Sequence, residues 1–347
     1  MMSFPEGGEG WSWENLFPFV FQPNAYDAIE GEEHTLARLH LNGYFTFHLR
    51  LPSTSSSRSV KMLCVCCFPR SLEEDSFVGE HLKQEDVERL LAADGERTIA
   101  LYVHGNAESV HSCFVARNFV NRHLSAVYLS FEWQGYGTNM ASSPRFDAQS
   151  ERCLALLRLL LKRGKAKPRN PVLLVGYSLG CAVLLDAIRK ERTACDARIA
   201  GLRAPIGTLL LAPFLSAASL IVSPPVVTDV VTHLFPPMNN ADAVMYLRTD
   251  VLVVHGAKDE IIPARHSSRL VRSFRSAVAN RSHRSDTLLV PEATHTNLLL
   301  GPNISYVSSV VRKFFRMQKR AYATHAEPLR RQRRDAPTVR GSSVIEI

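Results

Sequence analysis

The sequence predicts an α/β fold: a mostly parallel central sheet with an antiparallel N-terminal hairpin and helices on both faces. Two observations predict it. From residue 98 onward, short continuous apolar runs alternate with helical stretches, as in parallel strands that are covered on both sides. Before that point, residues 43–51 alternate between apolar and polar side chains, and a Ser-rich loop separates them from a second apolar run at 60–68. This pattern predicts a hairpin over 43–68 that extends one edge of the sheet.

Each element of the parallel part follows from this alternation. Strands are expected at 99–103, 126–131, 172–175, 207–211, 251–254 and 287–290. Helices are expected near 109–122, 149–163, 179–190, 265–278 and 303–318. We divide the chain into an N-terminal segment (1–42), one domain (43–318) and a basic disordered tail (319–347). Within the domain we expect an acidic insertion at 69–97 and a small lid region at 213–245.

Composition limits the class of protein. Of 347 residues, 46% are hydrophobic and 21% are charged, which excludes a fully disordered or fibrous chain. The net charge of +8 first suggests a polyanion or an acidic membrane as partner. However, residues 1–97 hold 8 Lys/Arg against 16 Asp/Glu, whereas residues 319–347 hold 7 against 3. The basic residues do not interleave with an aromatic stacking platform, so we expect no nucleic-acid partner. A peripheral membrane contact and the oligomeric state are left open.

The cysteines and the apolar runs indicate which cellular compartment to expect for the protein. Seven cysteines, no secretory signal pattern and no apolar run of about 18 residues predict a cytoplasmic protein with reduced thiols. Cys64, Cys66 and Cys67 fall within a predicted strand and are expected in the core. No His/Cys spacing suggests a metal site, and no cofactor is expected. The aromatic residues at 11–21 suit either a segment that covers the core or a membrane-surface anchor.

The stretch from Pro171 to Gly180 carries the strongest chemical signal. A buried strand runs into Gly176-Tyr177-Ser178-Leu179-Gly180, a G-x-S-x-G pattern, and a helix follows. Such a strand-to-helix turn is so sharp that only small residues fit at 176 and 180. It raises the hydroxyl of Ser178 above the sheet next to a helix N-terminus. The pattern therefore predicts a nucleophilic serine on a nucleophile elbow that includes Gly176 and Gly180.

A serine nucleophile needs a base and an acid that orients the base. In this architecture the acid and then the base follow the serine along the chain. Asp259 follows the strand at 251–254, and His295 follows the strand at 287–290. Both loops open on the same edge of a parallel sheet as Ser178. We therefore predict Ser178, Asp259 and His295 as the triad, with Glu260 and Asp286 as competitors for the acid.

An oxyanion hole needs two convergent backbone N–H groups. Leu179, directly after the nucleophile, is expected to supply one. The loop after the strand at 99–103 is expected to supply the other, from Asn106, with Ala107 as the runner-up. His104 at the end of that strand is interpreted as support for the loop rather than as the base.

Taken together, these motifs resemble the α/β-hydrolase superfamily, and within it the depalmitoylase branch of α/β-hydrolase domain-containing proteins. The shared motifs are HGNA at 104–107, E-W-Q-G-Y-G at 132–137, GYSLG at 176–180 and HGAKDEIIP at 255–263. The resemblance covers about residues 99–316. It implies the α/β-hydrolase fold, serine hydrolysis and an acylated protein or a lipid as substrate. Glu132 stands where the family usually has Asp, and the family's N-terminal cysteine cluster is missing before Cys64.

The chain is thus expected to be a serine hydrolase that cleaves acyl ester or thioester bonds through an acyl-enzyme. The resemblance points to palmitoyl-protein thioesterase activity. One alternative is a lipid or carboxylic ester hydrolase, and another is a non-catalytic, membrane-associated binding protein with a hydrolase fold. About 40 residues, several of them prolines, lie between the strand that ends at 211 and the strand that starts at 251, so only a small lid fits there and it leaves room for a bulky acyl donor.

Overall fold

The computed structural model describes residues 32–51, 60–69, 78–83, 85–87, 89, 97–139, 143–161, 170–193, 203–221 and 238–334, with the backbone alone for 325–334. Several expectations fall outside this part of the chain. They concern the aromatic segment at 11–21, most of the insertion at 69–97, residues 222–237 of the lid region and residues 335–347 of the tail.

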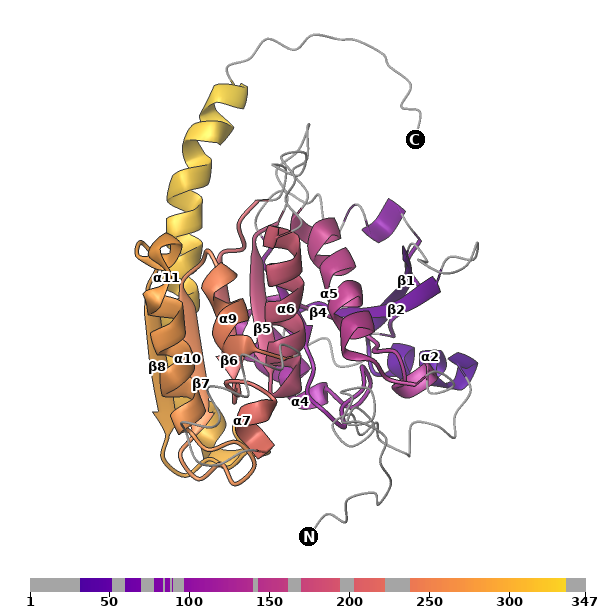
Figure 1. Cartoon of the computed structure of the whole chain (residues 1–347). Helices are drawn as coiled ribbons and strands as arrows, with labels where there is room; N and C mark the ends of the chain where they lie inside the picture. The colour runs from indigo at the N-terminus through magenta and orange to yellow at the C-terminus, as the bar shows by residue number, and fades with distance from the viewer. Residues whose placement is uncertain are drawn as a thin grey trace, which may run out of the picture.

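Among the described residues, eight strands form one sheet in the order β1-β2-β4-β3-β5-β6-β7-β8 (Figure 1). The strands are β1 (Phe45–Leu51), β2 (Val60–Cys67), β3 (Ile99–Val103), β4 (Val127–Phe131), β5 (Val172–Tyr177), β6 (Gly207–Leu211), β7 (Val251–Gly256) and β8 (Ser285–Val290). β1 pairs antiparallel with β2, and β2 pairs antiparallel with β4. The remaining pairs are parallel. The predicted fold class is confirmed, including the hairpin that extends one edge.

The central strands are buried on both faces, which explains their continuous apolar runs. Successive side chains point to opposite sides of the sheet. Leu101 of β3 and Leu174 of β5 therefore enter one hydrophobic layer, whereas Tyr102 and Val175, one residue further on, enter the other. The sheet therefore separates two hydrophobic cores, one on each face.

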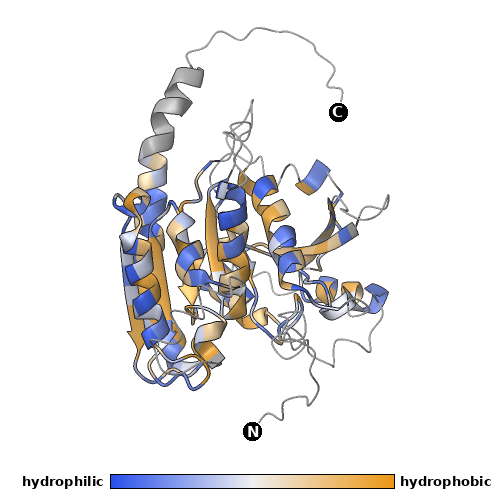
Figure 2. Ribbon diagram, viewed as in Figure 1, coloured by the Kyte–Doolittle hydropathy of each residue, from blue (hydrophilic) through white to orange (hydrophobic). Residues whose placement is uncertain are grey.

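Helices cover both faces of the sheet (Figures 1 and 2). One layer contains α5 (Phe146–Leu161), α6 (Leu179–Thr193), α9 (Asn240–Ala243), the 3₁₀ turn η4 (Val244–Tyr246) and α10 (Arg265–Ser276). The other contains α2 (Glu32–Leu41), α4 (Phe114–Asn118), its π-helical continuation η2 (Phe119–His123) and α11 (Gly301–Arg334). Shorter elements are η3 (Gly137–Asn139), α7 (Ala218–Ile221) and η5 (Val278–Asn280). The strands are hydrophobic and the outer helix faces are largely hydrophilic.

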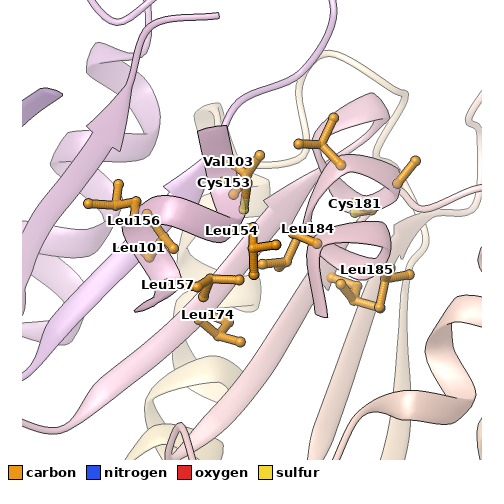
Figure 3. Close-up of a cluster of buried hydrophobic side chains, with 14 of the residues drawn as sticks. Leu101, Val103, Cys153, Leu154, Leu156, Leu157, Leu174, Cys181, Leu184 and Leu185 are labelled. Carbon is orange, nitrogen blue, oxygen red and sulfur yellow. The ribbon is translucent and has the colours of Figure 1, made fainter. Parts of the chain in front are cut away.

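Figure 3 shows how α5 and α6 pack against the centre of the sheet. Leu157 of α5 and Leu184 of α6 lie over Leu101 and Leu174, and each is at most 2% exposed. Full burial of such a side chain contributes about 1.5–3 kcal/mol. This layer fixes α6 against β5 and so fixes the turn between them, where Ser178 lies.

The thiols behave as the sequence predicts. Within the described residues, Cys64, Cys66 and Cys67 of β2 are buried thiols, as are Cys113, Cys153 and Cys181. Burial raises the pKa of the Cys66 thiol, and the neighbouring Cys67 and Cys64 add to the rise. The expectation that the cluster at 64–67 packs into the core is confirmed.

The domain boundary expected at residue 43 stays a prediction, and the structure packs α2, within the expected N-terminal segment, against the core. Leu39 of α2 is 1% exposed and lies in the core beside Tyr44. The side chain of His40 also reaches β1, with Nε2 2.9 Å from Thr46 Oγ1.

The disorder expected from residue 319 is wrong for residues 319–334, which continue α11. Gln318 Nε2 donates to Asp250 Oδ2 at 3.0 Å, and Arg203 Nη1 donates to the Tyr322 hydroxyl at 3.3 Å. These contacts anchor a segment rich in strong helix formers, so the helix continues. Figure 1 shows α11 running past the end of the sheet. None of the helices in the described part of the chain has the length and apolar content that crossing a bilayer demands.

Candidate active site

Ser178 lies on the sharp turn between β5 and α6. Its φ is +51°, a left-handed conformation that costs a non-glycine residue about 1–3 kcal/mol. A Cβ on Gly180 would lie 2.1 Å from the carbonyl oxygen of Val103, and one on Gly176 would lie 2.9 Å from Cys181 Cα. Glycine at both positions lets the turn close against β3 and hold the serine in its strained conformation.

The three side chains predicted as a triad meet at the carboxyl edge of the sheet. His295 Nε2 lies 3.0 Å from Ser178 Oγ, and His295 Nδ1 lies 2.8 Å from Asp259 Oδ2. All three residues are buried. An ionised carboxylate only accepts hydrogen bonds, so Nδ1 carries the proton and Nε2 is left to accept from the serine hydroxyl. The competitors Glu260 and Asp286 are exposed.

Asp259 is held as a carboxylate by several donors. Oδ1 accepts from the N–H groups of Ile261 at 3.0 Å and Ile262 at 2.7 Å. Burial raises the pKa of Asp259, but the hydrogen bonds from His255, His295 and Ile262 outweigh it and hold the pKa well below its usual range. The acid is therefore charged at neutral pH and can stabilise a protonated His295.

Backbone hydrogen bonds fix the loop of Asp259 against the loop of His295. Ala257 N–H donates to the Val290 carbonyl at 2.8 Å, and Lys258 N–H donates to the Ala293 carbonyl at 2.9 Å. The two loops approach so closely that a Cβ on Gly256 would lie 2.3 Å from the Ala293 carbonyl oxygen. Pairing of β7 with β8 thus continues beyond the strands and sets the distance between acid and base.

The loop after β3 carries the predicted oxyanion donors. Gly105 N–H donates to Glu108 Oε2 at 2.6 Å, and the Tyr136 hydroxyl donates to Asn106 Oδ1 at 2.8 Å. Gly105 N–H is therefore engaged within the loop, and Asn106 and Ala107 remain the candidates. Ala107 has a φ of +57°. On the other side, Leu179 is the first residue of α6, so its N–H has no acceptor one turn earlier in the helix.

Tyr177 is a functional residue that the sequence reasoning missed. Its hydroxyl donates to the backbone carbonyl of His295 at 2.6 Å, and its ring stacks on the imidazole with centroids 5.6 Å apart. Burial raises the pKa of Tyr177, and Glu108 and Asp259 raise it further, so the phenol keeps its proton and remains a donor. Tyr177 fixes the histidine loop to the elbow. It is the variable residue of G-x-S-x-G, and that position gives no signal of this role.

Glu108 was also missed. Its carboxylate accepts from Gly105 N–H and from the Tyr102 hydroxyl at 3.2 Å. Burial raises the pKa of Glu108, while these two hydrogen bonds and His295 oppose the rise. Through its hydrogen bonds to Gly105 and Tyr102, the Glu108 side chain holds the loop that carries Asn106 and Ala107. The only signal in the sequence is its place three residues after Gly105.

His104 and the turn at 132–137 support the same loop. The His104 ring is buried and stacks on Trp133 with centroids 4.2 Å apart, and His104 Nδ1 lies 2.9 Å from the Gly105 carbonyl oxygen. Gly137 has a φ of +49°, and a Cβ there would lie 2.1 Å from Glu132 Oε2. The glycine thus makes room for the longer Glu132 side chain at a position where the resembling family has Asp.

Among the described residues, no group of three or more His, Cys, Asp or Glu side chains is arranged to hold a metal ion. The chemistry available to the arrangement is that of a hydroxyl with a buried base and acid. Such a series generates an alkoxide-like nucleophile without a cofactor.

Comparison with known proteins identifies the family. The model of the alpha/beta hydrolase family matches residues 100–303, more than half of the chain. This chain belongs to the alpha/beta hydrolase family. The matched stretch contains the elbow and the loops of Asp259 and His295.

Solved structures resemble this alpha/beta hydrolase in fold. A hydrolase-like protein from Agrobacterium vitis is 15% identical with a TM-score of 0.50, over 78% of this chain and 98% of that chain. An acylaminoacyl peptidase from Pyrococcus horikoshii is 10% identical with a TM-score of 0.51, over 79% of this chain and 41% of that chain. Mouse alpha/beta hydrolase domain-containing protein 10 is 13% identical with a TM-score of 0.44, over 78% of this chain and 98% of that chain.

At these identities, the two structures with TM-scores of 0.50 and 0.51 show the fold alone. A search of the curated proteins finds no significant match. The depalmitoylase branch and the thioester specificity of this alpha/beta hydrolase therefore stay predictions.

Proposed function

We propose that this alpha/beta hydrolase is a serine hydrolase that cleaves acyl ester or thioester bonds through an acyl-enzyme. The observation that carries the proposal is the buried series Ser178–His295–Asp259, whose hydrogen bonds of 3.0 and 2.8 Å start from a serine with a φ of +51°. Strained backbone at such a turn exposes a hydroxyl to substrate beside a helix N-terminus.

In the first half-reaction, Ser178 Oγ attacks the acyl carbonyl carbon while its proton moves to His295 Nε2. Asp259 stabilises the imidazolium through Nδ1. The carbonyl oxygen becomes an oxyanion, which the N–H of Leu179 and that of Asn106 receive. Collapse of this intermediate breaks the bond to the leaving alcohol or thiol, and the leaving group takes the proton from His295.

In the second half-reaction, water replaces the leaving group. His295 Nε2 accepts a proton from the water as its oxygen attacks the acyl-serine carbonyl. The new oxyanion occupies the same donors. Its collapse breaks the ester bond to Ser178 Oγ, which recovers its proton from His295, and the free carboxylic acid leaves.

An acyl group on a protein or a lipid is the substrate class that suits the rim of the site. Ile261, two residues after Asp259, is 57% exposed, and Leu220 on α7 is 45% exposed. Both lie on segments that leave the carboxyl ends of β7 and β6, the same edge as Ser178. Apolar side chains exposed at this edge suit an apolar chain on the substrate. The palmitoyl-protein thioesterase activity that the motifs imply is one member of this class.

A labelling experiment tests the proposal. A fluorophosphonate probe is expected to label the wild-type protein and to leave Ser178→Ala unlabelled. A panel of paired oxyesters and thioesters of graded acyl length then gives the leaving group and the chain length. Absence of labelling and of turnover in the folded wild-type protein would refute the proposal and favour a non-catalytic binding protein.

Variants of the rim test the substrate class. Ile261→Ser and Leu220→Ser are expected to raise KM for long acyl chains by about 5- to 20-fold each and to leave short chains unchanged, because burial of apolar area on the chain is lost. Val278→Ser is the matched control, since Val278 is 70% exposed but lies beyond the far end of α10. An equal effect of all three variants on long chains would contradict an apolar rim.

A further inference from the structure

A second buried histidine contacts the acid of the proposed triad. His255, on β7, has no exposed surface. Its Nε2 lies 3.1 Å from Asp259 Oδ2, the same oxygen that receives His295 Nδ1. Its Nδ1 lies 2.5 Å from Ser267 Oγ. Ser267 is likewise fully buried and lies in the first turn of α10.

The partners of His255 decide which of its nitrogens carries a proton. Nε2 faces Asp259 Oδ2 and, at 2.7 Å, the carbonyl oxygen of Ile262. A carboxylate and a carbonyl only accept hydrogen bonds, so Nε2 carries hydrogen in either protonation state of the ring. In the neutral ring Nδ1 is then an acceptor, and the Ser267 hydroxyl is the donor that fits it. Ser267 therefore selects the tautomer in which the Nε2 hydrogen of His255 faces both the Ile262 carbonyl oxygen and Asp259 Oδ2.

We propose that Ser267 and His255 are positioning residues for Asp259, so that the triad is one end of a continuous series Ser178–His295–Asp259–His255–Ser267. This inference rests on the proposed function. The series ties the acid to α10, the helix that connects β7 to β8. Neither residue touches the reacting atoms.

The second arm of this series, formed by His255 and Ser267, has two consequences for Asp259. With Oδ1 held by the N–H groups of Ile261 and Ile262 and Oδ2 held by two imidazoles, the carboxylate is fixed in orientation. In addition, His255 shares the charge of Oδ2 with His295. Loss of this donor leaves more of the charge to His295, which stabilises its imidazolium form.

Other ionisable groups act on the same series and stay in place in the test. Glu108 and Tyr177 lie on the His295 side. His266 of α10 lies on the His255 side, with Arg265 and Arg269 acting on it in turn. None of the hydrogen bonds described above joins these side chains to His255. Because the charge of His255 acts on His266, Ser267→Ala, which keeps His255, is the variant that changes the surroundings least.

The test measures the rate at which a fluorophosphonate labels Ser178 as a function of pH. His255→Phe removes the hydrogen bonds to Ser267 and Ile262 and the 3.1 Å contact with Asp259 Oδ2, and it is expected to slow labelling about 10- to 100-fold, since a shift of about 1 Å in a catalytic group can cost 100-fold. Ser267→Ala removes only the hydroxyl and is expected to slow labelling about 2- to 10-fold. In both variants the acid limb of the profile is expected to move to higher pH.

Two further variants separate positioning from general packing. His255→Gln keeps an N–H near the place of Nε2 and is expected to recover most of the rate lost in His255→Phe. His81→Gln is the matched control, because it alters a histidine that bonds a hydroxyl, Thr46 Oγ1 at 3.0 Å, at the opposite edge of the sheet. It is expected to leave the rate and the pH profile unchanged.

The outcomes are distinguishable. If the wild-type protein is not labelled at Ser178, the proposed function fails. If Ser178 is labelled normally while Ser267→Ala and a folded His255→Phe show the wild-type rate and the wild-type acid limb, only this inference is overturned. If His255→Phe does not fold, Ser267→Ala, which removes a single oxygen, decides alone.

Discussion

Two clusters of hydroxyl and imidazole groups lie on the sheet, one on the edge strand β1 and one at the carboxyl ends of the parallel strands, and only the second has the features of a catalytic centre. On β1, at one edge, Thr46 Oγ1 lies 2.9 Å from His40 Nε2 and 3.0 Å from His81 Nδ1. At the carboxyl ends of β5 and β8, Ser178 Oγ lies 3.0 Å from His295 Nε2. The distances are the same within 0.1 Å.

Their surroundings differ in two ways. Thr46 belongs to a regular strand paired with β2, whereas Ser178 has a φ of +51° on a turn into a helix. The hydroxyl of Thr46 is shared by two histidines, whereas His295 places its second nitrogen on the buried carboxylate of Asp259. A hydrogen bond between hydroxyl and imidazole therefore does not by itself make a nucleophile; in our proposal the strained turn and the buried acid make the difference at Ser178.

The largest effect is expected from the hydroxyls themselves. Ser178→Ala should lower kcat on an activated ester by roughly 10⁶-fold, because loss of the nucleophile removes the acyl-enzyme route. Thr46→Val, which removes the hydroxyl of the β1 cluster, should leave kcat within about twofold of wild type. The measurement is steady-state turnover with both variants shown to be folded. A large loss of kcat in Thr46→Val would break the contrast between the clusters.

The acid tests the second difference. Asp259→Asn should lower kcat by about 10⁴-fold, because an amide no longer stabilises the protonated base and can favour the wrong tautomer of His295. Asp250→Asn is the control, since Asp250 lies at the other end of β7 and accepts from Gln318. Single-turnover acylation rates compare the two. Equal rates for Asp259→Asn and wild type would show that the carboxylate is not what sets this cluster apart.

The strained turn is tested by stability. Gly180→Ala should lower the free energy of unfolding by about 3 kcal/mol or more, because its Cβ would lie 2.1 Å from backbone oxygen that cannot move independently. Gly301→Ala is the matched control. Gly301 has a φ of +52° with nothing within 4 Å of a Cβ, so only the conformational cost of about 1–2 kcal/mol is expected. Urea unfolding of both variants gives the comparison; similar losses would mean that the turn is not closely packed.

The smallest effect concerns pH. Burial, followed by the charges of Arg265 and His255, lowers the pKa of His266 to about 4. The pKa of His266 is about 6.5 in the unfolded chain and about 4 in the folded chain. At a pH between these two values, the unfolded chain binds a proton that the folded chain does not. Stability should therefore fall by about 1–3 kcal/mol as pH drops from about 6.5 to about 4. Urea unfolding at pH 7 and pH 4.5 should show a flatter dependence for His266→Asn than for wild type, and the same slope in both proteins would contradict this.

How accurately the sequence predicted the ends of a strand or helix depended on how deeply that element is buried. β3 and β6 begin and end where expected, because strands buried on both faces are continuous apolar runs between polar loops. β8 begins two residues earlier than expected, at Ser285, since an edge strand partly faces solvent and its polar start resembles a loop. The helix expected from residue 109 begins at Phe114, because Val110 and Cys113 are buried from a turn rather than from a helix.

Residue type and chain order by themselves were enough to predict the fold class and to single out Ser178, Asp259 and His295 as the candidate triad. A parallel sheet places the loops after its strands at one edge, so their order along the chain is enough to bring the three together. The contacts of Tyr177, Glu108 and His255 were decided only by the tertiary structure. They join residues up to 118 positions apart through hydrogen bonds of 2.5–3.2 Å. The spacing of residues along a chain cannot specify distances that short, because they depend on how the loops pack against one another.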